Sequence, residues 1–197
     1  MPLGALALSS ACWGQGEDPP GDAVGSFDAT GLMVEQSCGS AIPAPDPLQL
    51  TFDLRAEDGG RAYWFRQGQM FAGIYKEGEF TFTVSQSWMV VQPDRFRGYA
   101  GCSVTQRDTF TFLVEEIEEV EAEAEAEADE AETDAELGAD AGVTPTLLTL
   151  SGSQTTEIEP LSGSDCRPAV VSYGGSFLSM PCRVEYVLTG SGVALVE

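Results

Sequence analysis

Histidine is absent from the 197-residue chain, and lysine occurs once, at Lys76. Without histidine, Ser-His-Asp and Cys-His catalysis and His-based zinc or iron sites are excluded. A Ser–Lys mechanism would have to use Lys76, but residues 75–79 are typical of an exposed turn, whereas an activated lysine needs desolvation. A carboxylate pair could still act as in glycosidases, yet 32 acids leave no particular pair to nominate. The sequence therefore nominates no catalytic residue, no metal ligand and no cofactor.

Basic residues are scarce, because Lys76 and eight arginines stand against 32 acids, for a net charge of −23. A surface this negative repels phosphate backbones, which argues against nucleic acid as a partner. Cations and cationic proteins remain possible partners of such a negative surface. The charge is also uneven, since residues 115–140 hold 14 acids and no bases, leaving 18 acids and 9 bases elsewhere.

No apolar run reaches the roughly 20 residues that a transmembrane helix needs. A short apolar stretch does run from Leu3 to Ala11 and ends at Cys12. This stretch resembles the tail of a bacterial lipoprotein signal, in which a small residue precedes the cysteine that is lipidated. It departs from that pattern at Ser9, where leucine is usual, and no basic residue precedes the stretch. The alternatives are a plain secretory signal tail, or a disordered N-terminus with a free thiol.

Residues 13–25 contain four glycines, two prolines and three acids, with Trp13 and Val24 as the only large apolar side chains. Such a segment cannot bury a core and behaves as a tether. The sequence therefore predicts a signal-peptide remnant over residues 1–11, a lipidated Cys12 with a flexible tether over 12–25, and one β-domain over 26–197.

The chain has no Cys-x-x-Cys pair, which argues against a zinc ribbon or a thioredoxin-type site. Apart from Cys12 there are four cysteines, an even number that predicts two disulfides in an exported chain. Three connectivities are open. We expect Cys166–Cys182, which closes a short loop and contributes about 3 kcal/mol in the chain-entropy account, together with Cys38–Cys102. The alternative is four buried free thiols.

Period-two alternation of apolar and polar residues marks strands with one buried face. It is clearest in four segments, and six weaker segments have the same composition of β-branched and aromatic residues. Short turns containing Gly59, Gly68 and Gly78 separate several of them, which indicates an antiparallel meander. We therefore expect an all-β fold, a sandwich or a small up-and-down barrel of about eight to ten strands. The clear segments are 48–55, 79–85, 109–114 and 183–189, and the weaker ones are 27–35, 61–66, 70–75, 88–92, 101–106 and 147–158.

The acidic low-complexity segment, residues 115–143, lies between two expected core strands and is therefore an insertion within one domain. Alanine and glutamate favour helix, but glutamates at i,i+4 without lysine partners oppose it. We expect a disordered or partly helical loop. It is a candidate for weak calcium or cationic-protein binding, although no Asp-x-Asp-x-Asp-Gly calcium loop is present and a solvated loop is the simpler interpretation.

Aromatic residues supply the candidates for lining a ligand pocket, namely Tyr63, Trp64, Phe65 and Trp88. On a strand, Tyr63 and Phe65 point to one face and Trp64 to the other. If the strands close into a barrel, inward aromatics could line a small apolar pocket, although ordinary core packing is the simpler interpretation. The loop containing residues 165–175 is a second candidate, and its alternative is a connection held by a disulfide.

The layout of the whole chain resembles that of uncharacterised envelope lipoproteins of Gram-negative bacteria, of the type abundant in large-genome myxobacteria. They combine a cysteine at the end of a signal, a Gly/acidic tether and a Cys-containing β-domain. The resemblance implies anchoring to the cell envelope through a lipid and carries no catalytic residues.

Three functions follow as hypotheses. The leading one is a non-enzymatic, envelope-anchored β-domain lipoprotein with a structural or interaction role. The alternatives are a small-ligand binding β-barrel and a carboxylate-dependent hydrolase. A filled barrel interior would favour the non-enzymatic envelope protein, and a ligand-sized cavity would favour the small-ligand binding barrel. A cleft with two carboxylates about 5–10 Å apart, one of them desolvated, would favour the hydrolase.

Overall fold

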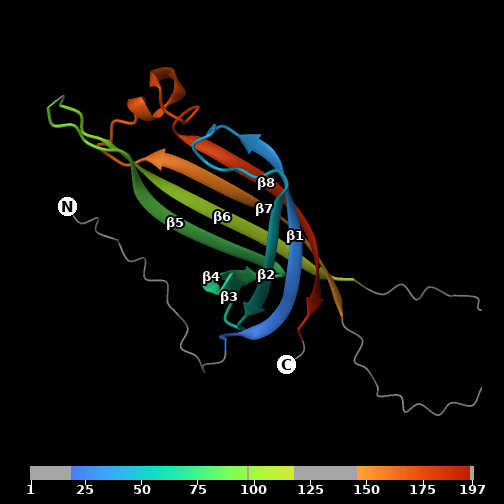
Figure 1. Cartoon of the computed structure of the whole chain (residues 1–197). Coiled ribbons are helices and arrows are strands. Elements are labelled where there is room, and N and C mark those ends of the chain that lie inside the picture. Colours follow the sequence, from blue (N-terminus) through green and yellow to red (C-terminus); the bar gives the residue numbers. More distant parts are fainter. Residues whose placement is uncertain (1–18, 97, 118–145, 196–197) are drawn as a thin grey trace, which may run out of the picture.

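The protein is an eight-stranded antiparallel barrel in which consecutive strands are neighbours and β8 pairs with β1 to close the sheet. The computed structural model describes residues 19–96, 98–117 and 146–195. Figure 1 shows a long curved wall of β5 to β8 with the short β3–β4 hairpin facing it. The strands are β1 (Asp22–Gln36), β2 (Leu48–Ala56), β3 (Arg61–Arg66), β4 (Gln69–Lys76), β5 (Glu79–Val91), β6 (Cys102–Glu116), β7 (Leu147–Pro160) and β8 (Cys182–Ala194).

The all-β antiparallel meander expected from the sequence is confirmed, and the barrel replaces the sandwich alternative. Ten expected segments become eight strands because two pairs of segments fuse. Residues 79–85 and 88–92 belong to the single strand β5, and residues 101–106 and 109–114 belong to β6. The backbone stays in register across both joints, since β5 and β6 pair continuously from Glu79↔Leu113 to Met89↔Ser103.

Two hairpin turns match their sequence signals. In both, a non-glycine residue and the following glycine have positive φ, at Gln67-Gly68 (51° and 75°) and at Glu77-Gly78 (51° and 86°). Two-residue turns with both φ values positive twist in the same sense as the flanking strands. The two turns connect β3 to β4 and β4 to β5 as tight hairpins.

The barrel interior is packed with aromatic side chains. The ring centroid of Trp64 lies 4.5 to 6.0 Å from those of five phenylalanines, and Phe52 stacks on Phe112 at 4.9 Å. Offset and edge-on aromatic pairs add stability beyond the area they bury. The phenylalanines around Trp64 are Phe52, Phe71, Phe82, Phe110 and Phe112.

Glycines on the inner faces of the strands make room for these rings. A Cβ atom on Gly192 would lie 2.5 Å from the Phe27 ring, and one on Gly73 would lie 2.4 Å from the Phe82 ring. At Gly152 a Cβ would meet the backbone oxygen of Thr111 at 2.0 Å. These three glycines therefore serve close approach within the barrel.

Substituting Gly152 with alanine tests this packing. Because the obstacle is the neighbouring backbone and cannot swing away, we expect a loss of about 1–3 kcal/mol in the free energy of unfolding. Gly59→Ala is the matched control, since nothing lies within 4 Å of the position that its Cβ would occupy. Urea denaturation of both variants measures the difference, and equal stabilities would contradict this packing.

The two ends of the barrel differ in construction. The β1–β2, β5–β6 and β7–β8 loops meet at one end, which we call the loop end (Figure 1). The start of β1, the end of β6, the start of β7 and the end of β8 lie at the opposite end. Most of the acidic segment falls within residues 118–145, outside the described residues, as do Cys12 and residues 13–18 of the expected tether. The last part of the expected tether is strand instead, because β1 begins at Asp22 and pairs with β2.

Candidate functional site

The aromatic residues expected to line a pocket separate to two faces of β3. Trp64 points into the barrel and is 2% exposed, within the ring cluster described above. Tyr63 and Phe65 lie on the outer face, where the Tyr63 hydroxyl donates a hydrogen bond of 2.6 Å to Glu57 Oε1. Trp88 is half-buried on the inner face, directly opposite Val104 on β6. The structure therefore brings Trp64 and Trp88, but not Tyr63 and Phe65, to the interior.

All four cysteines after Cys12 form disulfides, but the expected connectivity is wrong. The bonds are Cys38–Cys182 and Cys102–Cys166, with sequence separations of 144 and 64 residues. Cys182 begins β8, and Cys38 follows the end of β1, which is the neighbour of β8 in the closed barrel. Barrel closure therefore decides the pairing, and the short loop from Cys166 to Cys182 remains open.

Both disulfides lie at the loop end. One joins the β1–β2 loop to β8, and the other joins the start of β6 to the β7–β8 loop. That last loop contains two short 3₁₀ helices, η1 (Arg167–Ala169) and η2 (Val171–Tyr173), and buries Phe177 against the β1–β2 loop through a bridge to Gly39. Covalent bonds and backbone pairing thus hold these loops in one arrangement.

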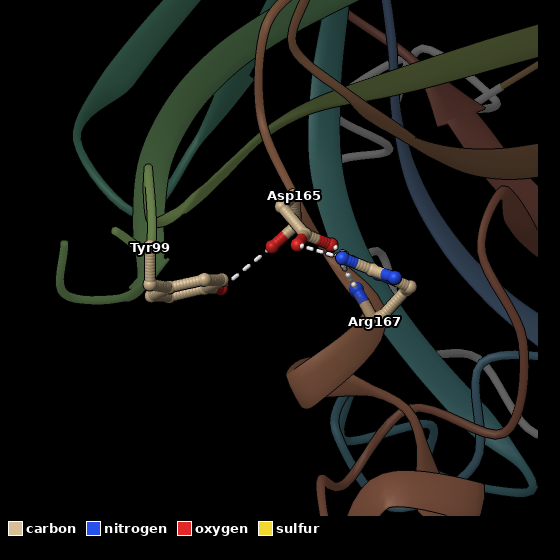
Figure 2. Close-up of polar contacts among 3 residues, drawn as sticks. All are labelled: Tyr99, Asp165 and Arg167. Carbon is tan, nitrogen blue, oxygen red and sulfur yellow. Dashed lines mark hydrogen bonds and ion pairs between the residues drawn. The ribbon is translucent and has the colours of Figure 1, made fainter. Parts of the chain in front are cut away.

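A polar contact at this end joins the β5–β6 loop to the β7–β8 loop (Figure 2). The Tyr99 hydroxyl donates to the backbone oxygen of Asp165 at 2.6 Å. Arg167 binds the Asp165 carboxylate with two hydrogen bonds, 2.9 Å from Nε to Oδ1 and 2.6 Å from Nη2 to Oδ2. Hydrogen bonding from Arg167 lowers the pKa of Asp165, and burial raises the pKa of Tyr99. A lowered pKa is the opposite of what a carboxylic general acid requires.

The Asp165–Arg167 pair predicts a measurable titration. Because Arg167 lowers the pKa of Asp165, the ion pair contributes to the stability of the fold at every pH above the ordinary Asp pKa. This contribution is lost as the pH falls through the lower pKa that Asp165 has in the folded protein. We expect Arg167→Gln to raise the Asp165 pKa, as measured by NMR titration of its carboxyl carbon. The control Arg61→Gln, on the outer face of β3, should leave this pKa where it is. An unchanged value in Arg167→Gln would show that the pair does not set it.

Large apolar side chains are exposed on the same loops. Phe96 is fully exposed, Tyr173 is 68% exposed, and Val171 and Leu178 are more than half exposed. Aromatic residues of this kind are enriched in protein–protein interfaces. The sequence indicated the loop containing Tyr173 as a candidate, but it gave no reason to include Phe96, which belongs to the β5–β6 loop.

Lys76 is the last residue of β4 and is exposed, as expected for a turn. No group of three metal-ligating side chains occurs among residues 19–96, 98–117 and 146–195, and no helix within this described part is long and apolar enough to cross a membrane.

Comparisons of the chain with models of protein families, with curated proteins and with solved structures found no match. The functional interpretation therefore depends on the fold and on the chemistry of the described residues. Among these, the two disulfides indicate an oxidising, extracytoplasmic compartment.

Proposed function

We propose that this chain is a non-enzymatic, lipid-anchored protein of the bacterial envelope whose loop end binds a protein partner. The observation that carries the proposal is the combination of a filled barrel interior with a covalently fixed loop end. Trp64 and the phenylalanine rings around it fill the barrel core, which favours a function carried by the exposed surface.

The position of the chain ends supports this arrangement. β1 begins at the end of the barrel opposite to the loop end (Figure 1). A lipid on Cys12, followed by the Gly/Pro-rich tether, would attach the barrel to the membrane from that side. The loop end would then be presented away from the bilayer.

The chemistry of the loop end fits a protein partner. Val171, Tyr173 and Leu178 belong to the loop between Cys166 and Cys182, which a disulfide fixes at each end, so binding costs little additional ordering of that loop. With a net charge of −23 the chain favours a partner whose surrounding surface is cationic.

Fractionation of cells tests the anchor. We expect the full chain to partition with membranes, and Cys12→Ser to release it into the soluble envelope fraction or to block its maturation. Cys102→Ser is the matched control, since it alters another cysteine without removing the anchor. A wild-type protein that is soluble and uncleaved, like its Cys12→Ser variant, would contradict the lipoprotein proposal.

A site-specific photo-crosslinker tests the interaction role. Placed at Tyr173, it should give a discrete cross-linked protein band in intact cells, which Phe96→Ser should weaken. Placed at Thr149, an exposed position on β7 toward the other end, it should give none. Equal cross-linking from both positions would contradict a specific loop-end interface.

A further inference from the structure

One edge of β5 has no neighbouring strand along most of its length. β5 pairs with β6 from Glu79 to Val91, but it pairs with β4 only from Glu79 to Thr81. Figure 1 shows the short β3–β4 hairpin beside the start of β5 only. Beyond Thr81, no described strand pairs with the side of β5 that faces away from β6. We call this side of β5, from Phe82 to Val91, the free edge.

The free edge presents backbone hydrogen-bonding groups to solvent. In an antiparallel sheet, alternate residues direct their backbone groups to opposite neighbours. The Gly78 oxygen accepts from Val114 N on β6, so even-numbered residues here face β6. The odd-numbered residues of β5 therefore direct their N–H and C=O groups to the free edge, and four of them are exposed. These four are Thr83, Ser85, Ser87 and Met89.

The free edge lacks the features that normally protect the edge of a sheet. Protected edge strands are short, or they carry charged residues or proline, because a long uncharged edge pairs with other chains. β5 has 13 residues, and residues 80–92 contain no charged residue and no proline. The irregularity in its pairing with β6 lies between Met89 and Val91, at the far end of the strand. The free edge is therefore a site for pairing with a further strand.

The backbone of the free edge is complementary to itself, because its four exposed outward-facing residues are symmetric about Gln86. A twofold axis through Gln86 places Ser85 opposite Ser87 of a second copy, and Thr83 opposite Met89. These pairs provide about eight backbone hydrogen bonds between the copies. An ordinary protein–protein interface contains about ten, so the pairing is sufficient for a specific contact.

Side chains along the free edge also fit a second copy. Val84 and Trp88 are half-buried on the inner face, and the twofold axis places each opposite the other, as a β-branched and aromatic pair that stabilises antiparallel strands. On the outer face, Arg107 lies opposite Ser85 on β6, and Arg61 lines a surface hollow beside β5. The net charge of −23 opposes association in general, but this contact adds no acid to it.

We propose that two copies of the chain pair antiparallel through their free edges, from Thr83 to Met89, with Gln86 on the twofold axis. The pairing extends one barrel sheet into the next and leaves the ring cluster around Trp64 in place. It turns the two loop ends in opposite directions. Two copies paired in this way are therefore held by two facing membranes, a step that rests on the proposed lipid anchor.

Sedimentation equilibrium of the full-length chain, produced without lipid, tests the pairing in about 0.15 M salt, which screens the negative charge. We expect a reversible dimer with a micromolar dissociation constant. Gln86→Lys places two ammonium groups opposite each other on the axis and should weaken the dimer about tenfold. Ser151→Lys adds the same charge at an exposed position of β7 and should leave the dimer unchanged. Urea denaturation checks that both variants fold.

A cysteine on the twofold axis tests the register in the Cys12→Ser background. Gln86→Cys should form a disulfide-linked dimer under mild oxidation, because the Cα atoms of a directly opposite, non-hydrogen-bonded pair lie about 4.5 Å apart, within disulfide range. Ser151→Cys is the matched control and should stay monomeric.

Three results would each overturn the pairing. They are a parent that stays monomeric at about 0.5 mM, a dimer that Gln86→Lys leaves as stable as the parent, and equal cross-linking from Cys at positions 86 and 151. A parent that is monomeric but binds a strand of another protein at β5 belongs to the first of these. Neither measurement uses the lipid or the loop end, so a negative result leaves the proposed function standing, and fractionation of Cys12→Ser tests that function separately.

Discussion

Replacing Trp64 with alanine is expected to lower the free energy of unfolding by about 3–5 kcal/mol, the range for large aromatic residues in packed cores. Trp64 is 2% exposed and contacts the rings of five phenylalanines from four other strands, so its removal leaves a cavity that short-range adjustments cannot fill. Urea denaturation followed by far-ultraviolet circular dichroism measures the change without relying on tryptophan fluorescence.

The matched control is Phe96→Ala, because Phe96 is fully exposed on the β5–β6 loop. Its removal should change stability by less than about 0.5 kcal/mol. A Trp64→Ala variant as stable as Phe96→Ala would mean that the barrel interior is not packed around Trp64, and a small-ligand barrel would become the better hypothesis.

Removing the Cys38–Cys182 disulfide through the double change to alanine should cost about 5 kcal/mol in the chain-entropy account. The bond spans 144 residues and joins the two strands that close the barrel, so its loss frees the unfolded chain over most of its length. Removing Cys102–Cys166, which spans 64 residues, should cost about 4 kcal/mol on the same basis.

Denaturation of both double variants, alongside the oxidised parent, gives these values. The comparison provides its own control, since both variants lose one bond and two cysteines at the same end of the barrel. A larger loss for the Cys102–Cys166 variant would contradict the assignment of Cys38–Cys182 as the bond that closes the barrel.

The strands were predictable from the sequence because apolar and polar residues alternate along most of their length. In the segments 48–55 and 109–114, apolar residues recur at every second position and point into the core. Barrel closure was not predictable in this way, because it depends on pairing between β1 and β8, which are far apart in the chain. The disulfide pairing was predicted wrongly for the same reason, since the favoured short loop takes no account of which strands are neighbours.

The two places where alternation fails also have a structural cause. Gln86 on β5 and Asp108 on β6 stand at inner positions, and both hydrogen-bond to Gln106. An inner face that the short β3–β4 hairpin leaves uncovered tolerates polar side chains there. At each of these residues the sequence therefore indicated two separate strands, one before it and one after it, where the barrel has a single strand.

The pocket lined by Arg66 and Asp108 could not have been predicted from spacing. Arg66 and Asp108 are 42 positions apart in the sequence and lie in no motif, and only the fold brings them to one cavity. The loop end was partly predictable, because the Tyr173-Gly174-Gly175 loop near Cys166 has the composition of an exposed connection.

Disulfide mapping by mass spectrometry, on protein isolated from its native cells under conditions that trap free thiols, tests the central claim most directly. A closed barrel in an oxidising compartment predicts peptides linked through Cys38–Cys182 and Cys102–Cys166. Four free thiols would contradict export, and Cys166 linked to Cys182 would contradict the closed arrangement of β1 and β8.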